Sequence, residues 1–571
     1  MTQKPSRKKL GSTLLQTIDP KEIAEERMRQ TVESLLNLIE ELNSKVIELD
    51  AENQRLKDEI NRLKGEQGKP DIKGKKPRGL SHNYSSEKER KNSKKHDKSR
   101  KKENIKIDRE QILEYPQDQL PADAEFKGYE EVIVQEIQLC TDNILFRKQK
   151  YYSPSEKKTY LAQLPAGYEG EFGPGIKALV ISLYYGGNMT QGKLLELLED
   201  LGISISAGHL SNLLIQNHQG FEKEKEEICS AGLASSPWQH LDQTSARVAG
   251  VNYTSNIICN PFYTVYVTTA RKDRLSVLKA LQNGFELEFL LNEMTYELLS
   301  QFDVSPKWQD GLKKLPQTVF DHDEFQKLLD RHLPSLGSRV RTRSAEAAAI
   351  ACYHSSTEWP VVQTLVCDDA PQFKSLTDNL SLCWVHEGRH YKKLNPLVAY
   401  HQQLLDQFLK DFWDYYRELL AYKDAPSPQA AEELWAEFYQ LFDSDSGYQQ
   451  LDERKRLTAA KISELLLVLE HPELPLHNNP AELGARTMVQ RRNISYGTQT
   501  LEGTKAWDIF MSLVATTRKL GISFFEYVRE RIGETETIPS LAALIHERSS
   551  HNPFGWSWQS ELSSTEAIFS R

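Results

Sequence analysis

The 571-residue sequence predicts a multidomain α+β protein, with an N-terminal parallel coiled coil, a helix-turn-helix region, and an α/β core that helical insertions interrupt. Three observations predict this class. A heptad repeat lies within the first 66 residues, strand-like segments follow one another after residue 237, and two long helical stretches break the strand pattern. A chain of this length has room for several domains.

Composition and charge narrow the class of protein. The formal net charge of −9 does not by itself indicate a nucleic-acid partner, although the charge is unevenly spread. The six cysteines are scattered without a C-x-x-C pair, which favours free thiols in a reducing cytoplasm over a disulfide framework. No apolar run is long enough to span a bilayer, and the N-terminus lacks the apolar core of a signal peptide. We therefore expect a soluble cytoplasmic protein.

Residues 1–19 are expected to form a tail, and residues 20–66 a leucine-zipper coiled coil. Val or Ile at position a with Leu or Met at position d favours two parallel strands, and the single Asn53 at position a fixes their register. We predict a homodimer through this coiled coil. Its flanking positions then pair opposite charges, namely Lys45 with Asp50, Glu52 with Lys57, and Glu59 with Lys64.

Three segments lie between the coiled coil and the core. Residues 67–110 are densely basic, which predicts a disordered segment that is either a solvated linker or a phosphate-contacting arm. Residues 111–165 alternate apolar and polar side chains in VIVQEIQL and ILFRKQKYY, as a small β unit does. Residues 166–232 contain a helix, a turn at Gly202 and a second helix. This spacing fits a helix-turn-helix that enters a major groove, and it equally fits plain helical packing.

The core is expected at residues 233–500. A strand over Trp238–Leu241 ends on Asp242, and two more strands follow it. A buried strand in VVQTLVCDD ends on acids, and Asp368 is the first charged residue after it. Its neighbour Asp369 points elsewhere if the alternation of the strand continues. Either acid alone could instead begin a turn, as Asp often does.

Helical stretches interrupt this core at residues 273–344 and 396–474, and we interpret both as insertions. The first separates the two Asp candidates, and the second separates them from the next acidic segment. Residues 501–571 are expected to form a C-terminal helical region followed by a polar tail.

The segment His477–Gly497 supplies a third acid. Asn479 can cap a helix, Pro480 fits its first turn, and Glu482 then falls at the third helical position. The basic residues that follow are Arg486, Arg491 and Arg492. A carboxylate beside arginines suits a site where a metal meets a phosphate backbone. The alternative is a capping box, in which the side chains of Asn479 and Glu482 satisfy each other's backbone donors.

Asp242, Asp368 and Glu482 together form the catalytic hypothesis. Three carboxylates at one place repel one another unless cations lie between them. Two Mg²⁺ or Mn²⁺ ions about 4 Å apart can activate the attacking oxygen and stabilise the leaving oxygen of a phosphodiester. We therefore predict a metal-dependent nuclease or transferase with these residues as its catalytic groups and metal ligands.

Five segments carry a resemblance to a known family: LDQT at Asp242, CDDAPQF at Asp368, CWVHEGRHY, NNPAELGARTMVQRRNISYGTQTLEG around Glu482, and ATTRKLGISFFEYVRERI near the C-terminus. The chain resembles a bacterial insertion-sequence transposase of the insertion-sequence-66 type, in the Asp-Asp-Glu superfamily. The resemblance covers roughly residues 160–532, apart from the first insertion. It implies a ribonuclease-H-like core, and a triad that cleaves transposon ends and transfers the strands to target DNA.

The resemblance also implies partners. The expected partners are double-stranded DNA, at the element ends and at the target, and small accessory proteins. The resemblance also implies association with the bacterial nucleoid. The residues it matches to DNA-facing positions are Arg389, Arg486, Arg491 and Arg492, and Lys392 and Lys393 also fit a nucleic-acid contact edge. The family usually carries a small zinc module before its helical region. The segment here holds one cysteine, Cys140, so we expect that fold without zinc.

Two other functions remain open. A catalytically inactive DNA-binding protein, related to such transposases, would need only the zipper, the basic arm and the helix pair. A zinc hydrolase would use His386, Glu387 and His390, which match H-E-x-x-H. That pattern works on a continuous helix with both histidines on one face. Here it follows a strand-like run and contains Gly388, which disfavours a zinc hydrolase.

Overall fold

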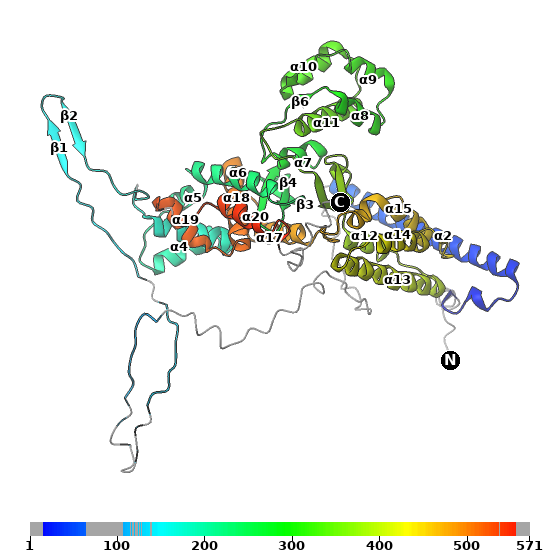
Figure 1. The fold of residues 1–571 in the computed structure, drawn as a ribbon, viewed down its shortest axis with the longest axis horizontal. Helices are drawn as coiled ribbons and strands as arrows, with labels where there is room; N and C mark the ends of the chain where they lie inside the picture. Colours follow the sequence, from blue (N-terminus) through cyan, green and yellow to red (C-terminus); the bar gives the residue numbers. More distant parts are fainter. Residues whose placement is uncertain are drawn as a thin grey trace.

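The computed structural model describes residues 15–63 and 107–555, with short gaps at 115, 117–118, 120–123, 125, 127, 138–139, 169 and 536. Both ends of the chain and most of the basic segment at 67–110 therefore lie outside the described residues. The described chain is a mixed α+β structure, in which helices surround a five-stranded sheet (Figure 1). Within these residues, no helix is both long and apolar enough to cross a membrane.

The central sheet has the strand order β5-β4-β3-β8-β9. Strands β3, β4 and β5 pair antiparallel, whereas β8 and β9 run parallel to β3. Strand β8 joins β3 after a long helical connection, as parallel pairing requires. The strands span Trp238–Val248 (β3), Val251–Cys259 (β4), Thr264–Thr269 (β5), Thr364–Cys367 (β8) and Asn379–Leu382 (β9).

Strand β3 is longer than the sequence indicated. We expected a strand that ended on Asp242, but β3 continues to Val248, and Asp242 pairs with Ile257 of β4. The two strands are joined by Ala249 and Gly250, which have φ angles of 48° and 79°. A two-residue turn with positive φ at both positions matches the twist of the strands, so the hairpin extends β3 beyond the acid.

Helix α18 (Leu501–Lys519) covers the edge strand β5. Three alternate backbone N–H groups of β5 donate to side chains of α18: Thr268 to Asp508 at 2.7 Å, Tyr266 to Ser512 at 2.9 Å, and Thr264 to Thr516 at 3.2 Å. The acceptors are four residues apart and therefore lie on one face of the helix. The helix thus satisfies a sheet edge that would otherwise be open to pairing with another chain.

Helix α17 (Asn479–Ser495) packs across β3 and β4. Gly484 lies at the contact, where an added Cβ atom would come within 2.7 Å of the Ile257 side chain. The absence of a side chain lets the helix approach the sheet closely. This close approach sets the distance between the first turn of α17 and the middle of β3.

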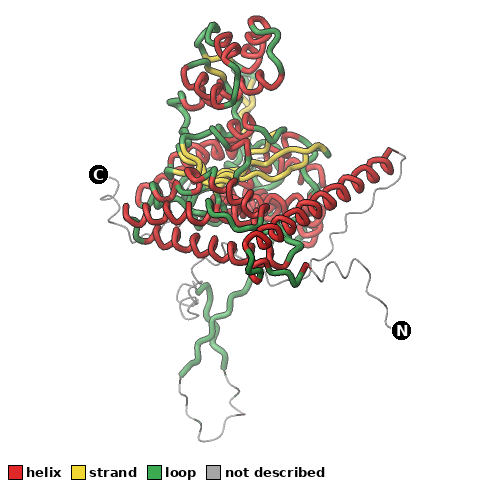
Figure 2. Tube along the Cα trace, turned by 90° about the vertical axis from the view of Figure 1, so that its right-hand side faces the viewer, coloured by secondary structure: helices red, strands yellow, loops and turns green. Residues whose placement is uncertain are grey.

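The first insertion begins with α7 (Arg274–Leu281), which packs against β4 and β5, and its outer elements form a lobe beyond the sheet (Figures 1 and 2). In its core, the rings of Phe289 and Phe325 stack with 4.9 Å between their centroids. Helix α11 begins inside the expected range and leads back to β8. The elements are α7 (Arg274–Leu281), β6 (Phe289–Leu290), α8 (Glu293–Gln301), α9 (Pro306–Leu312), β7 (Val319–Phe320), α10 (His322–His332) and α11 (Ser338–His354).

The second insertion packs beside the sheet around a hydrophobic core of its own. Trp384, at the start of α12, lies in this core with Phe412 and Phe438, so the insertion is joined to the segment that follows β9. That segment forms α12 (Trp384–Tyr391), and the elements of the insertion are α13 (Ala399–Asp424), α14 (Pro428–Phe442), α15 (Gln449–Ala459) and α16 (Ile462–Leu465).

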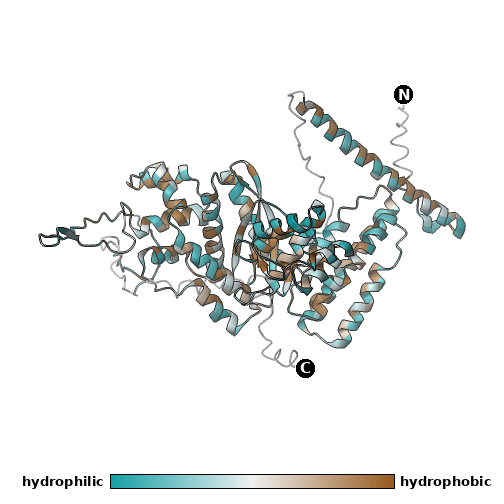
Figure 3. Ribbon diagram, turned by 90° about the horizontal axis from the view of Figure 1, so that it is seen from above, coloured by the Kyte–Doolittle hydropathy of each residue, from teal (hydrophilic) through white to brown (hydrophobic). Residues whose placement is uncertain are grey.

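Helix α2 (Glu26–Leu63) contacts the second insertion through one face. Leu36 is buried there, and the Glu40 carboxylate accepts hydrogen bonds from the backbone N–H groups of Leu397 and Val398 at 2.7 and 2.9 Å. The heptad side chains from Leu42 onward are exposed, whereas Val32 and Ile39 are half-buried and Val32 packs in this contact. Apolar positions recur along the helix (Figure 3). Exposed d-position residues include Leu35, Leu42, Leu49 and Leu56.

The segment in which we expected a helix pair contains α4 (Gln191–Asp200) and α5 (Ala207–Ile215). Thr190 caps α4 and Ser206 caps α5, and Gly202 has a φ of 75° in the turn between them. The remaining helices near this pair are α3 (Pro174–Ile181), α6 (Gln219–Ala234), α19 (Phe524–Gly533) and α20 (Leu541–His551).

The small β unit expected at 111–165 is reduced to one hairpin. Strands β1 (Lys150–Ser153) and β2 (Lys158–Leu161) pair antiparallel, and the other described residues of this segment form no strand. Val132 and Val134 of VIVQEIQL are exposed. An alternating pattern specifies a strand where one face can be buried, and the described residues offer this segment no such face.

Candidate active site

Asp242 lies near the middle of β3, largely buried. Its Oδ1 accepts a hydrogen bond from the backbone N–H of Gln243 at 2.7 Å. Burial, together with the charges of the Asp368 and Glu482 carboxylates, raises the pKa of Asp242 to about 6 in spite of that hydrogen bond. The three acids that the sequence singled out therefore share one electrostatic environment, and we call them the acidic triad.

Asp368 and Asp369 follow the end of β8 and meet different groups. The Oδ1 atom of Asp368 is buried and has no hydrogen-bond partner among the described residues. The carboxylate of Asp369 instead contacts Lys374 at 2.8 Å and Lys461 at 3.1 Å. Strand β8 ends at Cys367 and the chain bends at Asp369, so the two side chains meet different groups although the strand alternation does not continue. The unpaired carboxylate is that of Asp368.

Glu482 lies in the first turn of α17, but this helix does not begin as we predicted. Its N-cap is Asn478 rather than Asn479, and no side chain makes a capping hydrogen bond, so the capping box does not form. The Asn478 side chain donates to the carbonyl oxygen of Leu241 at 2.7 Å, and its Oδ1 lies 3.0 Å from Nδ1 of His240. These contacts tie the start of α17 to β3, beside the first acid.

Basic side chains surround the Glu482 carboxylate. The nearest atoms belong to Arg389 at 3.2 Å, His386 at 3.6 Å and Arg486 at 3.7 Å. The ligand atoms of Cys383, His386 and Glu482 also lie within 4.8 Å of one another, whereas among the described residues the acidic triad does not form so compact a group. Glu482 thus leans towards α12 rather than towards the two Asp residues.

The acidic triad fits a divalent cation. Carboxylate oxygens are the donors that Mg²⁺ and Mn²⁺ prefer. Burial, and to a smaller extent the charges of the other two carboxylates, raise the pKa of Asp242, and a bound cation would oppose both effects. The buried Oδ1 of Asp368 lacks a partner among the described residues. Glu482, now paired with Arg389, would complete the set.

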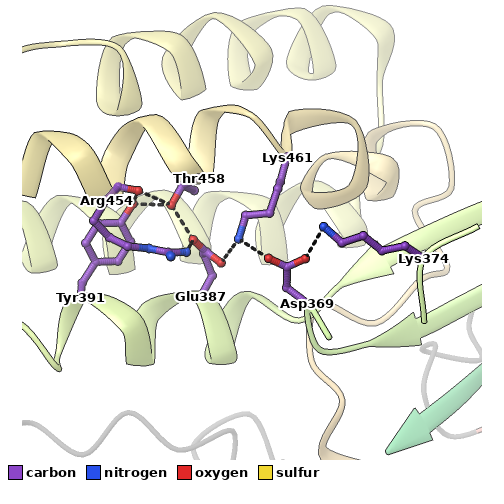
Figure 4. Close-up of polar contacts among 7 residues, drawn as sticks. All are labelled: Asp369, Lys374, Glu387, Tyr391, Arg454, Thr458 and Lys461. Atoms are coloured by element: carbon purple, nitrogen blue, oxygen red, sulfur yellow. Dashed lines mark hydrogen bonds and ion pairs between the residues drawn. The ribbon is translucent and has the colours of Figure 1, made fainter. Parts of the chain in front are cut away.

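A second group of charged residues adjoins the triad, and there each carboxylate meets cationic side chains (Figure 4). We call it the matched cluster, and its members are Asp369, Lys374, Glu387, Arg454 and Lys461. Lys461 contacts Glu387 at 2.6 Å, and Glu387 also contacts Arg454 and accepts a hydrogen bond from Thr458. Burial opposes the ionisation of Glu387, but these partners outweigh it and hold the pKa of Glu387 below its usual value.

The segment His386–His390 is helical, contrary to our expectation, because α12 continues through Gly388. An added Cβ atom at Gly388 would come within 2.7 Å of the Trp413 ring, so this glycine permits close packing against α13. Glu387, which a zinc hydrolase would use as its base, is 3% exposed and held in the matched cluster. The H-E-x-x-H pattern therefore offers no free base.

The residues predicted to face DNA differ in exposure. Arg389, Lys392, Lys393 and Arg486 are exposed. Arg492 is half-buried and donates to Ser245 of β3. Arg491 is fully buried and donates a hydrogen bond to the carbonyl oxygen of Tyr184 at 2.6 Å. Its guanidinium carbon also lies 3.8 Å from the centroid of the Tyr184 ring. This burial contradicts the predicted DNA contact of Arg491, which instead packs α17 against the helical region before the core.

Sequence reasoning missed three residues that shape the site. Arg454 and Lys461 lie in a helical stretch with an ordinary charge pattern, and their partner Glu387 is 67 and 74 residues away. No local signal marks such pairs. Asn478 had a signal, because two asparagines precede Pro480, but we assigned the capping role to Asn479.

Comparison with known proteins gives two matches. The model of a family described as "Transposase IS66 family" matches residues 341–506, which include Asp368 and Glu482 but not Asp242. "Uncharacterized protein y4jO" from Sinorhizobium fredii (strain NBRC 101917 / NGR234) is 31% identical over 319 residues, which is 55% of this chain and 98% of that protein. No solved structure matches the chain.

Proposed function

The chain belongs to the IS66 transposase family, and from this premise we propose that it is a DNA transposase whose acidic triad carries the chemistry. It cleaves the ends of its element and joins the freed 3′-hydroxyl groups to target DNA. Both steps are in-line phosphoryl transfers at one site. One observation carries the proposal: Asp242, Asp368 and Glu482 lie close enough for two of these carboxylates to raise the pKa of the third.

The sheet supports this proposal. Its antiparallel strands β5, β4 and β3 are followed by the parallel strands β8 and β9, which is the arrangement expected of a ribonuclease-H-like core. Asp242 comes from the central strand, Asp368 follows the adjacent parallel strand, and Glu482 comes from a helix packed on both β3 and β4. Groups on a rigid sheet and helix keep their geometry better than groups on loops.

The residues around the triad have distinct roles. Divalent cations, when bound, supply positive charge to the attacking and leaving oxygens of the phosphodiester. Asp242 and Asp368 hold ligand oxygens at fixed positions on the sheet, and Glu482 adds a third from α17. Arg389 and Arg486, which lie beside Glu482 and are exposed, contact the phosphate backbone and position the scissile strand.

We propose two partners, duplex DNA and a second copy of the chain. The exposed Lys392 and Lys393 extend the basic surface beside the triad, and the pair α4–α5 offers a second DNA contact. The heptad side chains of α2 are exposed from Leu42 onward, whereas Val32 packs against the second insertion, so the exposed later part of the seam is available for a parallel dimer. The dimer holds both element ends together.

A cleavage assay tests the proposal. Purified protein is mixed with a labelled duplex that carries the inverted repeats flanking its own gene, in Mg²⁺ or Mn²⁺, beside the variant Asp242→Ala. We expect the wild type to nick the repeat end and the variant not to do so. Binding without nicking in either metal would favour the inactive DNA-binding protein. Equal nicking by both proteins would show that Asp242 is not part of the site.

A further inference from the structure

Two segments that carry site residues each carry an acid at the position directly after the site residue. Asp369 follows Asp368 after β8, and Glu387 follows His386 on α12. Asp369 lies in a bend directly beyond Asp368, so a contact that fixes Asp369 also restrains the backbone that carries Asp368. On a helix, neighbouring side chains are about 100° apart, so an anchor at Glu387 fixes the rotation of α12 and the direction of His386.

One lysine, Lys461, contacts both Asp369 and Glu387. The ammonium group of Lys461, between α15 and α16, lies 3.1 Å from Asp369 and 2.6 Å from Glu387. Its side chain is 9% exposed, so solvent screens these contacts little. Lys461 belongs to the second insertion, and it joins the segment after β8 to α12 (Figure 4). The insertion therefore reaches to within one residue of Asp368.

Lys374 makes a useful contrast with Lys461. It contacts the same carboxylate of Asp369, at 2.8 Å, but its side chain is 44% exposed, and it comes from the loop just beyond Asp369 itself. A contact within one loop does not join two segments. Exposed ion pairs also contribute little to stability. If bridging matters, the two lysines should differ in effect although they share a partner.

A buried ion pair can also affect only the stability of the fold. Replacing such pairs by apolar groups is often neutral for stability, so burial of Lys461 does not by itself assign it a role in the site. If Lys461 only stabilises the fold, its replacement should change stability without a specific change in metal affinity. A residue that orients metal ligands predicts weaker metal binding, because outer contacts typically matter by about 10- to 100-fold for affinity.

We propose that Lys461 is a positioning residue of the acidic triad. By bridging Asp369 and Glu387, it holds Asp368 on the sheet and holds α12, with His386 and Arg389, against Glu482. The inference rests on the proposed function, because it assumes that the triad binds divalent cations. It gives the second insertion a part in the chemistry, through a residue that contacts neither metal nor DNA.

The test compares Lys461→Met with Lys374→Met, Lys461→Arg and Asp369→Asn in the full chain. Mn²⁺ binding without DNA is measured from the electron paramagnetic resonance signal of free Mn²⁺. The Mg²⁺ concentration for half-maximal cleavage of the repeat-end duplex is measured in parallel. We expect Lys461→Met and Asp369→Asn to weaken Mn²⁺ binding by about tenfold and to shift the Mg²⁺ requirement equally. Lys374→Met should stay within about twofold, and Lys461→Arg should recover most of the loss.

The outcomes separate this inference from the proposed function. If Lys461→Met binds Mn²⁺ as tightly as the wild type does, whatever its melting temperature, the inference is overturned and Lys461 only stabilises the fold. If Lys461→Met does not fold, Asp369→Asn decides, because it removes one contact and keeps the side-chain shape. A wild type that binds Mn²⁺ but never cleaves would remove the proposed function, while the Mn²⁺ comparison still tests Lys461. A wild type that binds no Mn²⁺ would overturn both.

Discussion

The acidic triad and the matched cluster lie side by side and use adjacent residues, yet they treat buried charge in opposite ways. Burial and neighbouring carboxylates raise the pKa of Asp242 to about 6. In the cluster, burial also opposes ionisation, but Lys461 and its neighbours lower the pKa of Glu387. The two regions differ because Arg454 and Lys461 of the second insertion contact the carboxylates of the matched cluster, whereas Asp242 has no such cationic contact among the described residues. Burial alone does not mark a functional acid, whereas buried negative charge without a matching cation does suggest a site for one.

The largest expected effect comes from removing one triad carboxylate. Glu482→Gln should reduce cleavage by about 10³-fold or more, the order seen when one group that stabilises a transition state is lost. DNA binding should persist, because Arg389 and Arg486 remain and lose only a partner. The measurement is single-turnover cleavage beside equilibrium binding of the same duplex. Loss of binding as well would show that Glu482 organises the fold rather than the chemistry.

The matched cluster should respond in stability instead. Glu387→Gln leaves Arg454 without its charged partner and leaves Lys461 with Asp369 alone, which should lower the free energy of unfolding by about 3 kcal/mol. The matched control is Glu346→Gln. Glu346 pairs with Arg274 at the base of the first insertion, but burial keeps its pKa raised, so its charge is worth less to the fold. Urea unfolding of both variants checks the order, and equal losses would break the comparison between the two regions.

The contrast between the regions follows from chain geometry that the sequence only partly reveals. The sequence could predict Asp368 after a strand and Glu482 near the start of a helix, because strand alternation and helix-start signals are local. The length of β3 was not, because it depends on pairing with β4 beyond Asp242. The burial of Arg491 against Tyr184 and the reach of Lys461 to Asp369 depend on packing between distant segments. No local pattern encodes either contact.

The pH dependence of stability should differ between the two regions in the metal-free protein. The folded chain keeps the Asp242 proton up to about pH 6, whereas the unfolded chain releases it near 3.8, so Asp242 should make stability fall as the pH rises through this window. The effect is on the order of 2 kcal/mol. Glu387 has a lowered pKa, so its contribution should be present above about pH 4.5 and be lost on acidification below it.

Two variants isolate these contributions. In metal-free buffer, Asp242→Asn should be more stable than the wild type at pH 7 and should lack the decline between pH 4 and 6, whereas Glu387→Gln should lack the loss below pH 4.5. Unfolding free energies measured at fixed ionic strength across pH 3.5 to 7.5 give both curves. An Asp242→Asn curve parallel to the wild type would mean that neither burial nor the neighbouring carboxylates raise the pKa of Asp242 in the folded chain.

The smallest expected effect concerns the outer border of the triad, where α17 carries one exposed and one buried arginine. Arg486 is 60% exposed, 3.7 Å from Glu482, so Arg486→Ala should weaken binding to every duplex and reduce the salt slope of log K by about one. Arg491 is enclosed by Tyr184 and Trp507, so Arg491→Lys should change stability and leave the slope intact. Binding titrations at several salt concentrations decide between them. An unchanged salt slope for Arg486→Ala would mean that the DNA backbone binds on another face of the protein. The DNA would then also approach the acidic triad from that other face.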